Sequence, residues 1–77
     1  MSGPVKRSVM IAGHATSVTL EPVFWQGLEA AAARRDLPLN ALVAQIDAER
    51  VAHSSPPNLS SAIRTWLYAQ SINENAS

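Results

Sequence analysis

The sequence contains no cysteine, so disulfide bridges and thiolate metal sites are excluded. Its two histidines, His14 and His53, lie far apart in the chain, and neither belongs to a zinc-ligand pattern. A domain of 77 residues usually buries too little surface to be secure alone, and small domains normally gain stability from disulfides, a metal or a partner chain. Because a partner chain is the remaining source of stability, we expect the protein to oligomerise. We expect no metal and no cofactor.

Long apolar runs are also missing. No run reaches the roughly 20 residues that a membrane span needs. The apolar part of the N-terminal segment, residues 9–13, is too short and too mixed for a signal peptide. We therefore expect a cytoplasmic protein that does not interact with a membrane.

The chain lacks the grouping of residues that nucleophilic catalysis requires. A nucleophilic serine needs a positioned base, an orienting acid and nearby oxyanion donors. Ser54 and Ser55 follow His53 in a proline-rich stretch, where serine is better explained as a turn residue. Only three glycines are present, and none belongs to a loop that could cradle a phosphate. We predict that the protein is not an enzyme and has no catalytic residues.

The sequence has no net charge, because six Lys and Arg balance six Asp and Glu. Proteins that bind nucleic acid obtain much of their affinity by neutralising phosphates, so this balance weakens a DNA-binding hypothesis. The charges are unevenly placed, however, since Lys6 and Arg7 precede the first acidic residue, Glu21.

Residues 6–20 are predicted to be extended, because β-branched and apolar side chains recur at every second position. The two alternating runs are Val9 and Ile11, and then Thr16, Val18 and Leu20. Gly13 lies between the runs and can supply the positive φ that a turn requires.

Helical periodicity and the placement of proline predict three helices after the extended region. The first begins at Pro22 and the second at Pro38, since proline suits the first helical position. The two prolines within residues 53–57 cannot continue a helix. Asn58 or Ser60 can then cap the third helix.

The predicted domain covers residues 6–72, between a disordered segment, 1–5, and a frayed polar tail, 73–77. A lone strand cannot satisfy its own backbone hydrogen bonds. We therefore expect the strand that ends at Leu20 to lack partners in its own chain and to find them in the same strand of a second copy, above four interlocked helices. The predicted dimer core consists of Val18, Leu20, Trp25, Leu28, Leu42, Val43 and Ile46.

Several short motifs follow one another in a characteristic order. The opening matches the pattern KRSV-x-IAGH-x-TSV-x-LEP between Lys6 and Pro22. Further matching segments are residues 24–25, 39–44, 46–47 and 58–64. The ordered set, which covers roughly residues 6–67, resembles the ribbon-helix-helix domain of the Arc/MetJ repressor superfamily, and most closely a bacterial subfamily with this opening.

The resemblance implies a mainly α fold with an N-terminal β-ribbon, built as an intertwined homodimer. This chain adds a third helix and, if residues 6–12 are extended, a further N-terminal strand. In the superfamily a two-stranded antiparallel ribbon enters the major groove of DNA, and its outward side chains contact base edges. Val18 and Leu20 are expected to face the core. The outward residues, assigned to base contact by resemblance, are Ala15, Ser17 and Thr19.

The N-terminus of the second helix would offer backbone N–H groups to a phosphate. The candidate phosphate contacts are Lys6, Arg7, Leu39 and Asn40. Three departures from the family pattern weaken these assignments. Ala15 makes no hydrogen bond where the family often has a basic residue. Ser17 and Thr19 cannot make the bidentate contacts that discriminate most strongly between bases. Pro38 replaces the serine that usually caps the second helix.

Residues 6–12 leave two alternatives open. If they fold back around Gly13, the sheet of a dimer has four strands and is roughly 15–20 Å across. The major groove is only about 12 Å wide, so such a sheet would not enter it in the usual way. If they form a flexible arm, the basic pair contacts phosphates. Met10 makes both faces of the run apolar, which favours the packed strand.

Two functional hypotheses follow. The first is a homodimeric DNA-binding protein, a transcription regulator that inserts its ribbon into the major groove. The second is an oligomerisation or protein-interaction module on the same fold, which binds a protein partner and no DNA. The zero net charge, Ala15, Pro38 and the apolar extra strand all favour the second hypothesis.

Overall fold

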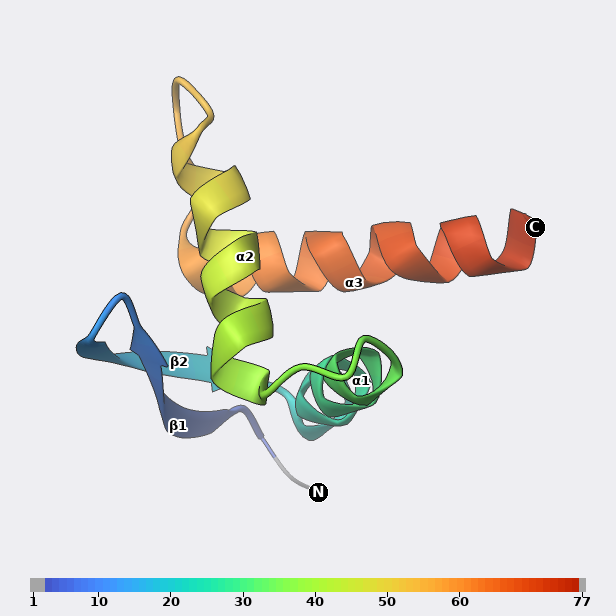
Figure 1. The fold of residues 1–77 in the computed structure, drawn as a ribbon, viewed down its shortest axis with the longest axis horizontal. Helices are drawn as coiled ribbons and strands as arrows, with labels where there is room; N and C mark the ends of the chain where they lie inside the picture. The colour runs from blue at the N-terminus through green and yellow to red at the C-terminus, as the bar shows by residue number, and fades with distance from the viewer. Residues whose placement is uncertain (1–2, 77) are drawn as a thin grey trace.

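A computed structural model describes residues 3–76 of the chain, with the side chains of residues 3–73. Two strands precede three helices (Figure 1). The elements are β1 (Val5–Ile11), β2 (His14–Leu20), α1 (Pro22–Arg34), α2 (Leu39–Val51) and α3 (Leu59–Ala76). The predicted order of a ribbon followed by helices is confirmed.

The strands β1 and β2 form an antiparallel hairpin, in which Ile11 faces His14 next to the turn. The two turn residues have positive φ, 52° at Ala12 and 82° at Gly13. These angles are typical of a type I′ turn, whose twist matches that of the flanking strands. The chain therefore folds back around Gly13, as one of the two alternatives predicted, and residues 6–11 are a strand rather than a flexible arm.

This hairpin corrects one expectation. The strand that ends at Leu20 was predicted to lack hydrogen-bond partners in its own chain, but β2 pairs with β1 along its whole length, from Val5 opposite Leu20 to Ile11 opposite His14. The prediction was wrong because it treated β2 as a lone strand, although the turn at Gly13 brings a partner strand from the same chain.

The helix boundaries follow from local chemistry. Pro22 is the first residue of α1, as predicted. The helix ends in a Schellman motif, in which Leu37 donates to the Ala32 carbonyl at 2.9 Å and Asp36 to the Ala33 carbonyl at 3.1 Å. Asp36 has a φ of 57°, which this motif requires of the residue after the helix.

The other two helices begin at or near their predicted positions. Pro38 is the extended residue before α2, which begins at Leu39 rather than at the proline itself. Asn58 caps α3, because its Oδ1 accepts the Ser61 N–H at 2.8 Å. The first strand begins at Val5, and α3 continues to Ala76.

The helices bury one face of the hairpin. In Figure 1, α2 stands across the hairpin, and α3 crosses α2 and reaches the end of β2. The buried side chains come from all five elements and form one core. Every residue of the predicted dimer core is buried within the single chain: Val18, Leu20, Trp25, Leu28, Leu42, Val43 and Ile46. None of the helices within residues 3–76 combines the length and apolar character needed to cross a bilayer.

The turn gives a first testable prediction. Ala12→Asn should raise the free energy of unfolding by about 0.5–1 kcal/mol, because Asn tolerates positive φ better than Ala. Gly13→Ala should lower it by about 1–2 kcal/mol. A Cβ at Gly13 would meet no atom within 4 Å, so the loss would be conformational and not steric. Urea denaturation of both variants measures these changes, and a neutral Gly13→Ala would contradict the turn geometry.

Candidate nucleic-acid interface

The hairpin has one exposed face and one face covered by helices. On β2, Val18 and Leu20 are buried, whereas the predicted base-contact residues Ala15, Ser17 and Thr19 are exposed on the other face. This inward and outward assignment was predicted correctly from the alternation of side chains along a strand. The β1 residues that lie opposite these three β2 residues are also exposed. The cross-strand pairs are Lys6 with Thr19, Ser8 with Ser17 and Met10 with Ala15. We call these six side chains the outer face.

Lys6 and Arg7, predicted together as phosphate contacts, lie on opposite faces of β1. Lys6 is exposed on the outer face. The Arg7 guanidinium lies 4.4 Å from the centre of the Trp25 ring on the covered face, and its Nη1 is 3.1 Å from a carboxylate oxygen of Glu29. The structure therefore does not bring these two cations together, and Arg7 binds within the chain.

Trp25 anchors β1 to α1 by a second contact. Its Nε1–H donates to the Val5 carbonyl at 2.9 Å, while its ring is buried. The ring stacks beneath Arg7, and such a cation–π contact is worth about 0.5–1 kcal/mol at a partly exposed site. These contacts hold the first half of β1 against α1.

The other two predicted phosphate contacts, Leu39 and Asn40, lie at the N-terminus of α2 beside β1. Asn40 Oδ1 accepts the Met10 N–H at 3.0 Å. The first helical hydrogen bonds run from Ala41 and Leu42 to the Pro38 carbonyl. Helix geometry thus leaves the N–H groups of Leu39 and Asn40 without acceptors inside α2. Leu39 contributes only backbone here, because its side chain packs against the core.

Both edges of the hairpin receive a side chain from a helix. At the β1 edge, Asn40 accepts the Met10 N–H. At the β2 edge, the Ser60 hydroxyl donates to the Thr19 carbonyl at 3.0 Å. Groups on a strand edge that are already bonded are less available to a further strand. These two edge contacts were not predicted from the sequence, because they join positions 30 and 41 residues apart.

An ion pair fixes the junction between the ribbon and α1. Glu21 accepts two hydrogen bonds from Arg64 of α3, at 3.0 Å from Nε and 3.3 Å from Nη2. These hydrogen bonds, together with one to its own backbone N–H, hold the pKa of the Glu21 carboxyl below its ordinary value. The contact ties α3 to the residue that directly follows β2.

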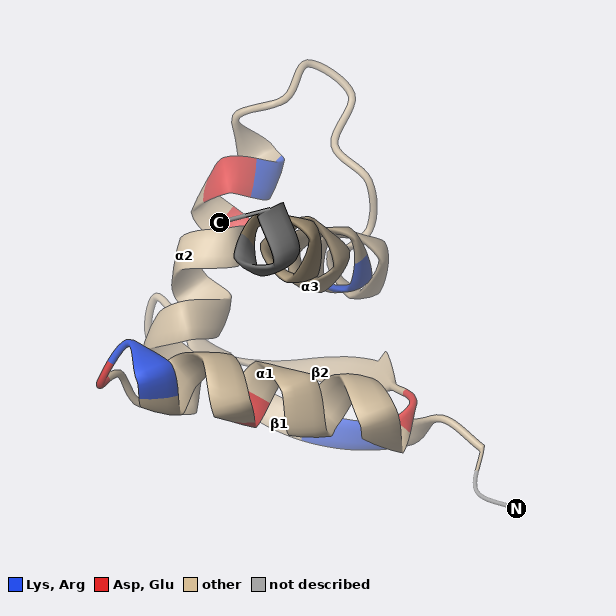
Figure 2. Cartoon of the chain, turned by 90° about the vertical axis from the view of Figure 1, so that its right-hand side faces the viewer, with Lys and Arg blue, Asp and Glu red and all other residues tan. Residues whose placement is uncertain are grey.

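Basic side chains are spread over the molecule rather than gathered on the outer face (Figure 2). Arg50 pairs with Asp47 at 2.8 Å. Arg35 donates to Gln70 at 2.6 Å and lies over the Trp66 ring. Among the six side chains of the outer face, Lys6 is the one basic residue. The described residues 3–73 also contain no group of three His, Asp or Glu side chains that could hold a metal ion.

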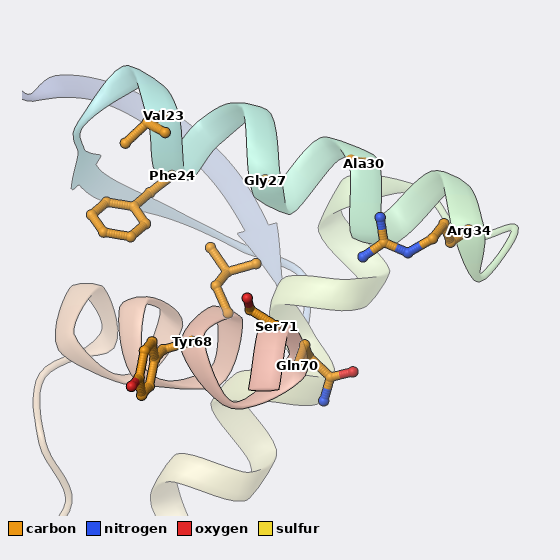
Figure 3. Close-up of a pocket in the computed structure, with 9 residues that line it drawn as sticks. Val23, Phe24, Gly27, Ala30, Arg34, Tyr68, Gln70 and Ser71 are labelled. Carbon is orange, nitrogen blue, oxygen red and sulfur yellow. The ribbon is translucent and has the colours of Figure 1, made fainter. Parts of the chain in front are cut away.

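A second surface feature lies between α1 and α3. Val23 and Phe24 of α1 and Leu67 and Tyr68 of α3 line a groove of about 430 Å³ (Figure 3). Val23 is 66% exposed and Tyr68 is 69% exposed, and Ile72 one turn beyond Tyr68 is 48% exposed. This groove was not predicted from the sequence, although Tyr68 and Ile72 are four positions apart and so share one face of the helix.

A two-stranded ribbon followed by packed helices, with an exposed outer face on the ribbon, defines a ribbon-helix-helix architecture. The family model of the ribbon-helix-helix domain matches residues 4–71, and the chain belongs to this family. Domains of this family typically belong to DNA-binding transcription regulators and generally form homodimers. The family is not an enzyme family. No curated protein and no solved structure matches the chain.

The Glu21–Arg64 pair gives a second prediction. In an Arg64→Met variant the pKa of Glu21 should rise toward its ordinary value, because the main cause of its lowering is removed. Because the pKa of Glu21 is lowered in the folded state, the ion pair stabilises that state fully at pH values above the ordinary pKa of the carboxyl. This contribution disappears as the pH falls through the lowered pKa. The stability difference between the two proteins should therefore shrink in acid.

Carboxyl NMR titration measures the pKa of Glu21 directly, and urea denaturation at several pH values measures the stability difference. Arg50→Met is the matched control, because Arg50 pairs with Asp47 and leaves Glu21 untouched. Equal titration of Glu21 in the parent protein and in Arg64→Met would show that the ion pair does not form.

Proposed function

We propose that the protein is a cytoplasmic transcription regulator that binds DNA as a homodimer and places the outer face of its hairpin in the major groove. The observation that carries the proposal is the exposure of Ala15, Ser17 and Thr19 together on one face of a two-stranded ribbon. Two strands lie about 4.8 Å apart. The groove is about 12 Å wide and admits a ribbon of this size.

The residues of the outer face have suitable but modest chemistry. The hydroxyls of Ser17 and Thr19 can donate to or accept from a base edge, and the Ala15 methyl can contact the methyl group of thymine. None of them makes the bidentate contact that discriminates most strongly. The affinity then depends on phosphate contacts, from Lys6 and from the N–H groups of Leu39 and Asn40 at the start of α2.

Arg7 is proposed to contribute less to phosphate binding than Lys6. Its guanidinium would have to leave both the Trp25 ring and the Glu29 carboxylate before it could reach a phosphate. Such a move exchanges one set of favourable contacts for another, so the net gain in binding is small.

The homodimer is proposed to form through the groove between α1 and α3. A β2-to-β2 pairing that extended to Thr19 would have to displace the Ser60 hydroxyl from the Thr19 carbonyl. It would also create the four-stranded sheet that is too wide for the major groove. A second copy seated on the groove would bury the exposed side chains of Val23, Tyr68 and Ile72. Burial of one such apolar side chain stabilises the dimer by about 1.5–3 kcal/mol.

DNA binding is tested by fluorescence anisotropy on a site selected from random duplexes, at two salt concentrations. The affinity should fall steeply with salt. Lys6→Ala should weaken binding to all sequences and reduce the salt slope by about 1.8, because the homodimer loses one phosphate contact of about 0.9 from each copy. The double change Ser17→Ala with Thr19→Ala should relax the sequence preference with little effect on the slope.

The control is Ser54→Ala, which changes an exposed serine in the loop between α2 and α3. It should leave both affinity and preference unaltered. Absence of binding to any duplex at low salt would reject the DNA-binding function.

The alternative function is an interaction module that binds another protein and no DNA. One specific observation favours it: Arg7, Arg50 and Arg64 each form an ion pair with a carboxylate of the same chain, so half of the six basic residues are already neutralised. This alternative uses the same dimer and differs from the first proposal only in what the outer face contacts.

The dimer surface has a test that does not depend on DNA. Tyr68→Ser combined with Ile72→Ser should weaken the dimer at least tenfold, because both side chains lose apolar area that the second copy covers. Sedimentation equilibrium measures the change. Val51→Ser is the matched control, because Val51 is also exposed, at 56%, but lies on α2 away from the groove. A dimer that resists the double change would place the interface elsewhere.

A further inference from the structure

A second cavity lies between the C-terminal half of α2 and the first half of α3, where the two helices cross (Figure 1). Its volume is about 270 Å³, close to the ~300 Å³ of the smallest usual ligand pockets. The α3 residues that line it are Ala62, Thr65, Trp66 and Ala69, and none of them lines the groove between α1 and α3. The cavity is therefore separate from the proposed dimer interface.

The walls of the cavity are mainly apolar. The buried Ile46 of α2 contributes one wall, and the half-buried Trp66 of α3 contributes another. Ala62 and Ala69 are seven positions apart, so they lie on the same face of α3, and their small side chains leave the space between the helices unfilled. Sites for small molecules usually combine such apolar walls with a few polar groups that orient the ligand.

The charged groups at the cavity leave one carboxylate unpaired. Arg50 is neutralised by Asp47 at 2.8 Å, and its Nη1 also donates to the Pro57 carbonyl at 3.1 Å. Within residues 3–73, whose side chains the structure describes, the Glu49 carboxylate has no hydrogen bond and no ion pair. With His53 taken as neutral, the cavity therefore carries one net negative charge, that of Glu49.

The Trp66 ring adds a second attraction for positive charge. The guanidinium of Arg35 already lies 4.9 Å from the centre of this ring. Arg35 does not line the cavity, so the part of the ring that does remains open to a ligand. Cations bind to indole rings more strongly than to the other aromatic side chains.

We infer that the cavity between α2 and α3 binds a small organic cation that carries an apolar group. The cationic group contacts the Glu49 carboxylate and the Trp66 ring, and the apolar group fills the space beside Ile46, Ala62 and Ala69. An anionic ligand is disfavoured, because it would meet Glu49 while the Arg50 charge is held by Asp47. The inference goes beyond the proposed function and does not depend on DNA binding.

The experiment compares two probes that share a phenyl group and differ in charge. Benzyltrimethylammonium is the cation and phenylacetate is the anion. Each is titrated into 15N-labelled protein, and the NMR shifts of the Glu49 and Thr65 amides and of the Trp66 indole N–H report binding at the cavity. The cation should shift these signals in a saturable manner, with an affinity at least roughly threefold higher than that of the anion.

Two variants test the charge and the space separately. Glu49→Gln should weaken the binding of benzyltrimethylammonium roughly threefold to fivefold and should not weaken that of phenylacetate. Ala69→Leu should abolish the binding of both probes, because its larger side chain fills the cavity. The matched controls are Glu29→Gln and Ala33→Leu, which make the same changes at exposed positions of α1 that do not line the cavity. Both controls should bind as the parent does.

Loss of fold is not expected in either variant, because Glu49 and Ala69 are both exposed, and the NMR spectra of the free variants verify it. The inference is overturned if neither probe shifts the cavity signals at 10 mM, or if the two probes bind equally well. It is also overturned if Glu49→Gln leaves the preference for the cation unchanged, or if the shifts map to the groove between α1 and α3 instead.

Discussion

The antiparallel pairing of β1 with β2 is the constraint on which the rest of the structure depends. It is closed by a turn in which Ala12 and Gly13 both have positive φ. The pairing gives β2 a hydrogen-bond partner in its own chain, and it sorts the side chains of both strands into a covered face and an outer face. Without it, the outward residues of β2 would belong to an isolated strand, which is not stable in water.

The helices position this ribbon through a few specific contacts rather than through apolar burial alone. Trp25 holds the start of β1, by its hydrogen bond to Val5 and by the stacking of Arg7 on its ring. Asn40 and Ser60 each bond to one edge of the hairpin. The cost of this arrangement is that most arginines are engaged within the chain, so a DNA-binding surface has to rely on Lys6, hydroxyl groups and backbone N–H groups.

Much of the fold could be predicted from the sequence, because its signals are local. Alternation gave the inward position of Val18 and the outward position of Ser17, Pro22 marked the first helix, and Asn58 marked the cap of α3. The face that Arg7 occupies could also have been inferred, since neighbours on a strand point to opposite sides. The register between the strands could not be inferred from the sequence, because it depends on the geometry of the turn. The edge contacts and the groove could not be inferred either, because they depend on packing between distant segments.

The central claim is that β1 and β2 pair within one chain, and isotope-filtered NMR on an equimolar mixture of 13C-labelled and unlabelled protein tests it most directly. The close pairing of Ser8 with Ser17 brings their Hα atoms together. The account predicts a strong nuclear Overhauser effect between these atoms within the labelled chains and none between labelled and unlabelled chains. Cross-strand effects that join β2 of one copy to β2 of another, without the pair in one chain, would contradict it.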